Sequence, residues 1–204
     1  MIIITSITAL FFDSYGISQY IYLNFDKVLF EFTIHTFLTS LFVSTSSFGF
    51  VNPTAVINLF FLFFMLFFLY FMARNIESSY GSSFLIRLFI ISGLFSALFY
   101  ILLRLSLLGI LPLDDPTQIY VGLAWGGIYG LISYIIFPTM RPEVRAFIPM
   151  RMSGRSFLIM IVSMRLMFGL FYALISPIYI LFYFPELGGI LGSYLVYKYK
   201  FLSH

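Results

Sequence analysis

The chain has 204 residues, of which 61% are hydrophobic, 22% aromatic and only 9% charged. Soluble globular domains carry about 25% charged residues because their surfaces face water, so this composition excludes an ordinary soluble domain and indicates a protein solvated by lipid. The net charge of +3 is too small and too scattered to indicate a nucleic-acid-binding protein. The absence of cysteine excludes disulfides, thiol catalysis and thiolate metal sites.

Apolar runs along the chain predict an all-α integral membrane protein, a single six-helix transmembrane bundle over residues 1–204. The predicted spans are residues 2–22, 54–73, 84–109, 119–137, 156–175 and 177–197. No basic residue precedes the first run, which favours a retained span over a cleaved signal peptide. Residues 24–53 are apolar but rich in Ser and Thr and end at Asn52-Pro53. This composition suits an interfacial or partly inserted outer loop better than a seventh span.

Basic residues are distributed unequally between the two sides of this six-span arrangement. One side carries eight of the eleven: Arg74, Arg87, Arg141, Arg145, Arg151, Arg155, Lys198 and Lys200. The other side carries Lys27 and half of the eight acidic residues: Asp26, Glu31, Asp114 and Asp115. The positive-inside rule makes the basic side cytoplasmic and predicts that both the N-terminus and the C-terminus lie there. A count of five or seven spans would lose this asymmetry.

Four charged residues fall within predicted spans, where a charge costs about 2.5–3.5 kcal/mol and usually faces the bundle interior. They are Asp13, Arg104, Arg165 and Glu186. Arg104 lies near the outer end of its span, and we expect its long side chain to extend to the interface. Asp13 has no assigned role.

Arg165 and Glu186 lie at matched depth, about 14–17 Å from the cytoplasmic ends of adjacent antiparallel spans. This placement makes them a candidate intramembrane ion pair. Such a pair either only offsets the cost of its own burial or belongs to a proton or substrate relay. A third possibility is that each charge finds a different partner or a water pocket.

Glycines are concentrated in the fourth and sixth spans, where small residues allow helices to approach closely. These candidate helix-packing residues are Gly126, Gly127, Gly130, Gly188, Gly189 and Gly192. Gly188 and Gly192 form a G-x-x-x-G pattern, which predicts a packing face on the sixth span.

Three short stretches stand in register with the spans. RNIE at 74–77, with Gly81, follows the second span, WGGIYGL occupies 125–131 in the fourth, and ELGG occupies 186–189 in the sixth. These stretches resemble three segments of the rhomboid superfamily, which contains intramembrane proteases and inactive relatives. The first resembles the rhomboid turn that contains a Glu and a later Gly. The second resembles the G-x-S-G-x-x-x-G nucleophile segment, and the third resembles the His-x-Gly-Gly segment. The resemblance covers about residues 54–197. It implies a rhomboid-like bundle with six helices and both termini inside.

The catalytic positions that this resemblance identifies are all degenerate. Trp125 matches the nucleophilic Ser, and Glu186 matches the general-base His. Met65 matches the Asn that stabilises the oxyanion, and Phe61 matches the His that precedes this Asn by four residues. Nucleophilic catalysis needs a hydroxyl near a base and donors for the oxyanion, so we expect a pseudoprotease and not an enzyme. His35 and the terminal His204 are too far apart to form a usual metal or haem site, and no metal or cofactor is expected.

Inactive rhomboid relatives, including the derlins, recognise transmembrane segments through an opening between the second and fifth helices. The resemblance therefore implies a non-catalytic protein that binds transmembrane segments of clients for membrane-protein quality control, trafficking or assembly. A derlin-type Trp-Arg pair in the first outer loop is absent, because Trp125 is the only tryptophan, so any relation to the derlins is distant. One face of the second span would line either this opening or the lipid. The residues of this face are Leu59, Phe60, Phe63, Phe64 and Phe67.

Two other functions fit the same residues. The chain would serve as an accessory subunit of a larger membrane complex, with its aromatic faces buried against a partner, or as a small-solute transporter or channel that uses the intramembrane charges. The expected partners are the lipid bilayer and transmembrane segments of other proteins, with no nucleic acid. Composition favours the plasma membrane of a prokaryote over an organelle membrane.

Overall fold

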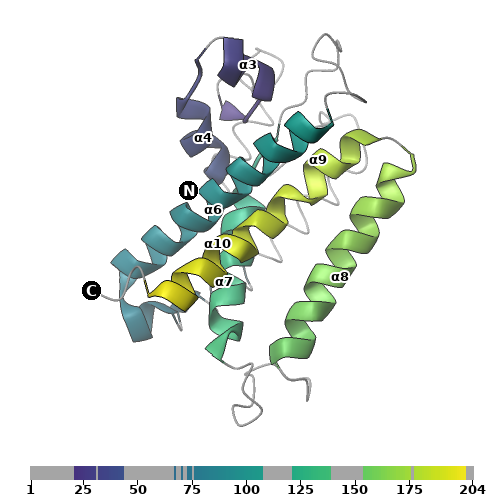
Figure 1. Ribbon diagram of the computed structural model, residues 1–204. Helices are drawn as coiled ribbons and strands as arrows, with labels where there is room; N and C mark the ends of the chain where they lie inside the picture. Colours follow the sequence, from purple (N-terminus) through teal and green to yellow (C-terminus); the bar gives the residue numbers. More distant parts are fainter. Residues whose placement is uncertain are drawn as a thin grey trace.

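The described part of the chain is helical (Figure 1). The computed structural model describes residues 21–30, 32–43, 67, 70, 73–74, 76–107, 121–138, 154–175 and 177–200. Among these residues three helical segments are long and apolar enough to cross a membrane. They are α6 (Ser82–Ser106), α8 (Gly154–Ala173) and Ile180–Tyr199, which comprises α9 (Ile180–Tyr183) and α10 (Pro185–Tyr199). The described residues therefore have the secondary structure and apolar lengths of an all-α membrane protein.

The predicted third and fifth spans match α6 and α8 within a few residues. The predicted first and second spans lie largely outside the described residues, although 67, 70, 73 and 74 are helical.

The fourth and sixth spans need correction. The expected helix over 119–137 begins only at Ala124, because Val121 forms an isolated antiparallel bridge with Leu23. This helix, α7 (Ala124–Ile136), has 13 residues. The expected helix over 177–197 starts as a 3₁₀ turn, η4 (Pro177–Tyr179), and is interrupted before Pro185. Proline has no N–H to donate to the preceding turn, so the helix breaks there.

α7 is the central helix of the bundle, and α6 and α10 both pack against it (Figure 1). Trp125 and Ile135 are its only residues that are not fully buried. The glycines make this packing possible. A Cβ on Gly130 would overlap Ser92 of α6, and a Cβ on Gly189 of α10 would overlap the backbone of Gly126. The three helices are thus joined by close backbone contact, as the small residues predict.

Before the second predicted span, the described residues 24–30 and 32–43 contain three short helices: α3 (Phe25–Phe30), α4 (His35–Thr39) and η2 (Ser40–Phe42). None is long enough to cross a bilayer. This segment covers the start of α7, where the Leu123 N–H donates to the Ser40 carbonyl at 2.8 Å and the Ala124 N–H to that of Val43 at 3.2 Å. Two N–H groups at the start of α7 thus find acceptors outside the helix.

α8 stands at the edge of the bundle (Figure 1). Only Gly154, Ile161 and Gly169 of its 20 residues are fully buried. Its main contacts are with η4 and α9, which follow it in the chain, and it touches α7 less extensively. Most of its apolar side chains are therefore left outside the described bundle.

Gly81, at the turn before α6, is required by backbone geometry. Its φ of 85° and ψ of 161° lie in a region that is essentially restricted to glycine. The Glu77 carboxylate accepts a hydrogen bond from the Ser82 hydroxyl across this turn. We expect Gly81→Ala to cost about 1–3 kcal/mol of stability, although no atom crowds the position. Unfolding in mixed detergent micelles measures the loss, and Ser83→Ala, at an exposed position two residues later, serves as the control. Equal stability of the two variants would contradict a conformational role for Gly81.

Candidate functional site

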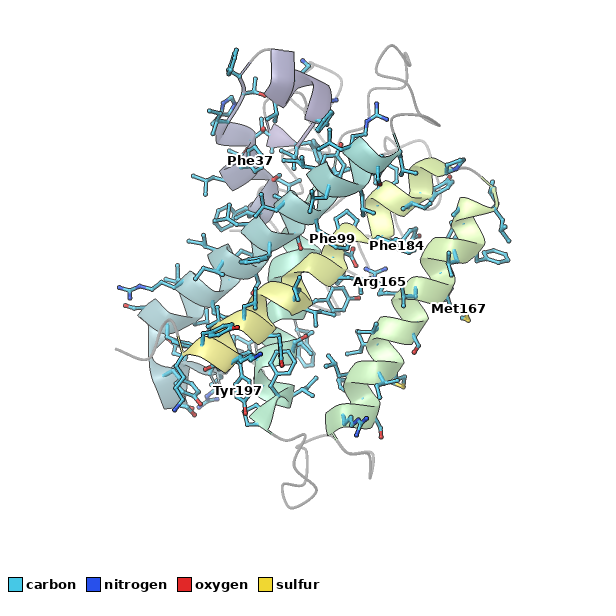
Figure 2. All side chains as sticks on the ribbon, viewed as in Figure 1. Phe37, Phe99, Arg165, Met167, Phe184 and Tyr197 are labelled. Carbon is cyan, nitrogen blue, oxygen red and sulfur yellow. The ribbon has the colours of Figure 1, made fainter. Side chains whose placement is uncertain are left out.

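An ion pair joins the edge helix to the core. Arg165 Nη2 of α8 lies 2.5 Å from Glu186 Oε2 of α10, and the two side chains are 16% and 8% exposed. Figure 2 shows Arg165 pointing from α8 toward α10, whereas Met167, two residues later, points away from the bundle. The pair expected from matched depth is therefore present as a direct contact.

Three aromatic rings surround the Arg165 guanidinium. Its central carbon lies 5.8 Å from the ring centroid of Trp125, 5.2 Å from that of Tyr129 and 5.4 Å from that of Tyr183. At such distances the negative face of an aromatic ring attracts a cation. We call Trp125, Tyr129, Tyr183 and Glu186 the Arg165 cage.

Helical spacing brings the cage together. Trp125 and Tyr129 are four residues apart on α7 and share one face, and Tyr183 precedes Glu186 by three residues across the α9–α10 junction. Pro185 opens α10, which places Glu186 in its first turn. The positive end of the helix dipole favours a carboxylate at that position.

Several buried polar atoms lie in or around the core without a hydrogen-bond partner. Arg165 Nε is one of them. The buried Ser133 hydroxyl, by contrast, donates to the Tyr129 carbonyl at 2.6 Å. The buried hydroxyls of Ser92, Ser96 and Ser193 have no partner. In the described ranges no three His, Cys, Asp or Glu side chains gather closely enough to hold a metal ion.

Trp125 and Glu186, two of the positions that the rhomboid resemblance would make catalytic, both contact Arg165. Met65 and Phe61 lie outside the described residues, as does Asp13. Of the residues expected to line the opening, Phe67 is described, and its side chain is 58% exposed. The others of that set fall outside: Leu59, Phe60, Phe63 and Phe64.

The six glycines serve the packing role expected of them. The residues that a Cβ at Gly127, Gly188 or Gly192 would meet all belong to α6. Gly127 faces Phe89, whereas Gly188 and Gly192 face Phe95 and its neighbours.

Arg104 is buried, with only 2% of its surface exposed, whereas the prediction had its side chain extending to the membrane interface. Arg104 stands in the last turn of α6, where the negative end of the helix dipole favours a cation.

Sequence reasoning missed Tyr129 and Tyr183 as members of the cage. A signal for both was available. Each lies one helical turn from a residue already singled out, Tyr129 after Trp125 and Tyr183 before Glu186, and each is aromatic, as cation binding favours.

The part of the chain that the structure describes is helical, with three candidate membrane-spanning helices and a charged pair enclosed by aromatic rings. Comparisons with protein-family models, curated proteins and solved structures gave no match for this chain. The resemblance to rhomboids therefore depends on the residues of this chain alone.

Proposed function

We propose that this chain is a non-catalytic, rhomboid-like membrane protein that binds transmembrane segments of other membrane proteins. In this proposal it has six spans with both termini in the cytoplasm and resides in the plasma membrane of a prokaryote. Its role is in quality control, trafficking or assembly of its clients.

The observation that carries the proposal is the meeting of Trp125 and Glu186 at Arg165. In the rhomboid alignment these two residues replace a nucleophile and its base, which must lie close together. Their convergence on one guanidinium supports that alignment, because a chance match of short motifs would place them independently. An ion pair and an indole ring in place of a hydroxyl and an imidazole support a binding role in place of catalysis.

The outer face of α8 supports client binding. Met160, Met164 and Met167 follow one another at helical spacing, and each is exposed. Methionine is flexible and polarisable, so surfaces rich in it adapt to partners of different shape. Such a surface suits a protein that accepts varied apolar helices.

Photocrosslinking from defined positions tests this function. A photoreactive residue replaces Met164 or Met167 on α8, and in matched controls it replaces Leu98 or Leu102 on the exposed side of α6. After irradiation of intact membranes, we expect the α8 positions to capture several different membrane proteins through their transmembrane segments and the α6 positions to capture few.

Other outcomes would contradict client binding. Capture of a single stoichiometric partner would favour an accessory subunit of a membrane complex. If the labels on both helices crosslinked only to lipid, the exposed face of α8 would no longer support client binding. Solute flux into liposomes that contain only this protein would favour the transporter alternative, in which Arg165 and Glu186 form part of a pathway.

A further inference from the structure

One end of the α6–α7–α10 core is covered by aromatic rings. The rings of Tyr80, just before α6, and Phe84, in its first turn, lie 4.9 Å apart. Both rings meet Tyr134 near the end of α7, at 5.8 and 5.2 Å, and Tyr134 meets Tyr197 near the end of α10 at 6.0 Å. Tyrosine is enriched where spans reach the membrane–water interface. The rings therefore indicate that this end of the core lies at an interface.

Exposed cations gather at the same end of the core. Arg74 and Arg87 are exposed near the start of α6, and Lys198 and Lys200 are exposed at the end of α10. Of the acids that the structure describes, only Glu77 lies at this end, and its carboxylate is hydrogen-bonded across the turn before α6. Among the described residues no carboxylate forms an ion pair with Arg87 or Lys198. This end of the core therefore carries an excess of positive charge.

Arg87 and Lys198 lie on the side of the core that faces away from α7. Gly189 of α10 packs on α7 and precedes Lys198 by nine residues, which is two and a half turns, so the two occupy opposite sides of α10. Ser92 of α6 meets Gly130 of α7 and follows Arg87 by five residues, so it also points to a different side. Figure 1 shows α6 and α10 side by side, with α7 behind both.

The glycine contacts also give the relative level of the two cations along the helices. Gly192 of α10 lies against Phe95 of α6, and the two helices are antiparallel. Lys198 follows Gly192 by six residues, and Arg87 precedes Phe95 by eight. These separations are about 9 and 12 Å in the same direction. The backbones of Arg87 and Lys198 therefore lie at nearly the same level on neighbouring helices.

Apolar side chains continue this face toward the middle of the helices. On α6, Leu98 follows Arg87 by eleven residues, or about three turns, and on α10 Leu191 precedes Lys198 by seven, or about two turns. Each leucine therefore shares a face with the cation of its own helix. Leu98 is 53% exposed and Leu191 is 48% exposed. We call Arg87, Leu98, Leu191 and Lys198 the lipid strip.

We propose that the lipid strip binds an anionic phospholipid, with its phosphate at Arg87 and Lys198 and its acyl chains along Leu98 and Leu191. The shape of the strip, two cations at the interface and an apolar surface below them, matches the charge and polarity of such a lipid along its length. This inference goes beyond the proposed function, since it concerns α6 and α10 and holds whether or not α8 binds clients.

The depth of Arg87 favours a phosphate partner. α6 has 25 residues and is about 37 Å long, somewhat longer than the hydrocarbon core of a bilayer at about 30 Å. Arg87 is the sixth residue of α6, so its backbone lies just inside the hydrocarbon and its side chain reaches up to the headgroups. The helix dipole does not favour a cation near the start of a helix. A phosphate supplies the negative charge that Arg87 otherwise lacks.

The two cations have complementary chemistry toward a headgroup. Arginine donates two parallel hydrogen bonds to phosphate oxygens, whereas lysine acts as a point charge. Lys198 Nζ lies 5.4 Å from the ring centroid of Tyr199, at the exposed end of α10. A zwitterionic headgroup carries its own ammonium, which offsets the phosphate, so two cations prefer a headgroup with a net negative charge.

Quenching of a fluorescent label by brominated lipid tests the strip on the complete protein. The chain contains no cysteine, so a cysteine in place of Leu191 carries the only label. The protein is placed in nanodiscs of phosphatidylcholine with a rising share of phosphatidylglycerol, whose acyl chains are brominated. The dependence of quenching on this share gives the preference of the labelled position for phosphatidylglycerol. A label in place of Met164, exposed on α8, is the control.

We expect the label at Leu191 to report a preference for phosphatidylglycerol at least about fivefold higher than the label at Met164, which is the factor that one basic side chain near an anionic surface supplies. Arg87→Gln combined with Lys198→Gln should lower the preference at Leu191 to that at Met164. Both residues are exposed, so the fold should tolerate the change. Arg87→Lys combined with Lys198→Arg keeps both charges and should retain most of the preference.

Arg155→Gln distinguishes a site from general surface charge, because Arg155 is an exposed cation in the first turn of α8. We expect it to leave the preference at Leu191 unchanged. Equal preferences at Leu191 and Met164 in the parent would overturn the proposal, as would full preference in the Arg87→Gln, Lys198→Gln variant. An equal loss in Arg155→Gln and Arg87→Gln would also overturn it. None of these results bears on the capture of clients by α8, so the two proposals fail separately.

Discussion

Glu186→Gln is expected to destabilise the protein by about 3–5 kcal/mol, the usual loss when one partner of a buried ion pair is removed. The substitution leaves the Arg165 guanidinium enclosed by three rings without its carboxylate. Arg165→Met together with Glu186→Gln should recover most of this loss, because no uncompensated charge remains. Equilibrium unfolding in mixed detergent micelles of the parent, both single variants and the double variant gives the coupling free energy.

Arg155→Met is the matched control for this cycle, since Arg155 is an exposed residue in the first turn of α8. Its effect should stay within about 0.5 kcal/mol, as for most surface substitutions. Additive losses in the double variant would show that Arg165 and Glu186 do not stabilise each other. The ion pair would then contribute no net free energy of stabilisation, even though the two side chains lie close together.

Gly189→Ala is expected to cost about 3 kcal/mol, the upper part of the range for overpacking a core. A Cβ at this position would meet the Gly126 carbonyl carbon at 2.6 Å and its Cα at 2.9 Å. A backbone cannot rotate away as a side chain does, so α7 and α10 would have to separate. The same unfolding measurement applies.

Gly192→Ala provides the comparison. Its Cβ would meet only the side chain of Phe95, at 2.8–2.9 Å, and that ring can shift. A smaller loss is therefore expected at Gly192 than at Gly189, and Leu191→Ala on the exposed side of the same helix should cost less than either. Equal losses at Gly189 and Gly192 would contradict the close backbone contact between α7 and α10.

The long apolar helices could be predicted from sequence because their signal is local. A predominantly apolar stretch of 20 or more residues is recognisable without knowledge of the rest of the fold, and α6 and α8 lie close to the positions expected of them. The start of α10 had a local signal in Pro185, which the prediction did not use. The start of α7 could not be placed, because it depends on another part of the chain. Val121 becomes extended by pairing with Leu23, about a hundred residues earlier, and that pairing has no local pattern.

The candidate site was predictable in part for a similar reason. Arg165 and Glu186 stand out because charges are rare in spans, and helix rise gives their depth. Trp125 stands out as the only tryptophan, but Tyr129 and Tyr183 are two of 15 tyrosines and are harder to single out. Which of those tyrosines face Arg165 depends on how α7, α8 and α9 are rotated about their axes, and sequence spacing alone does not determine that rotation. Arg104 illustrates the same point, since the rotation of α6 about its axis decides whether the Arg104 side chain is buried.

The central claim of this account is that Trp125, Arg165 and Glu186 meet deep within a membrane. Trp125 is the only tryptophan in the chain, so its fluorescence in liposomes with lipid-attached quenchers at graded depths reports the position of the cage directly. We predict that quenchers near the ends of the acyl chains act most strongly and that iodide in the water acts weakly. Strong quenching by iodide, or by quenchers at the headgroups, would place the cage at the surface and contradict the account.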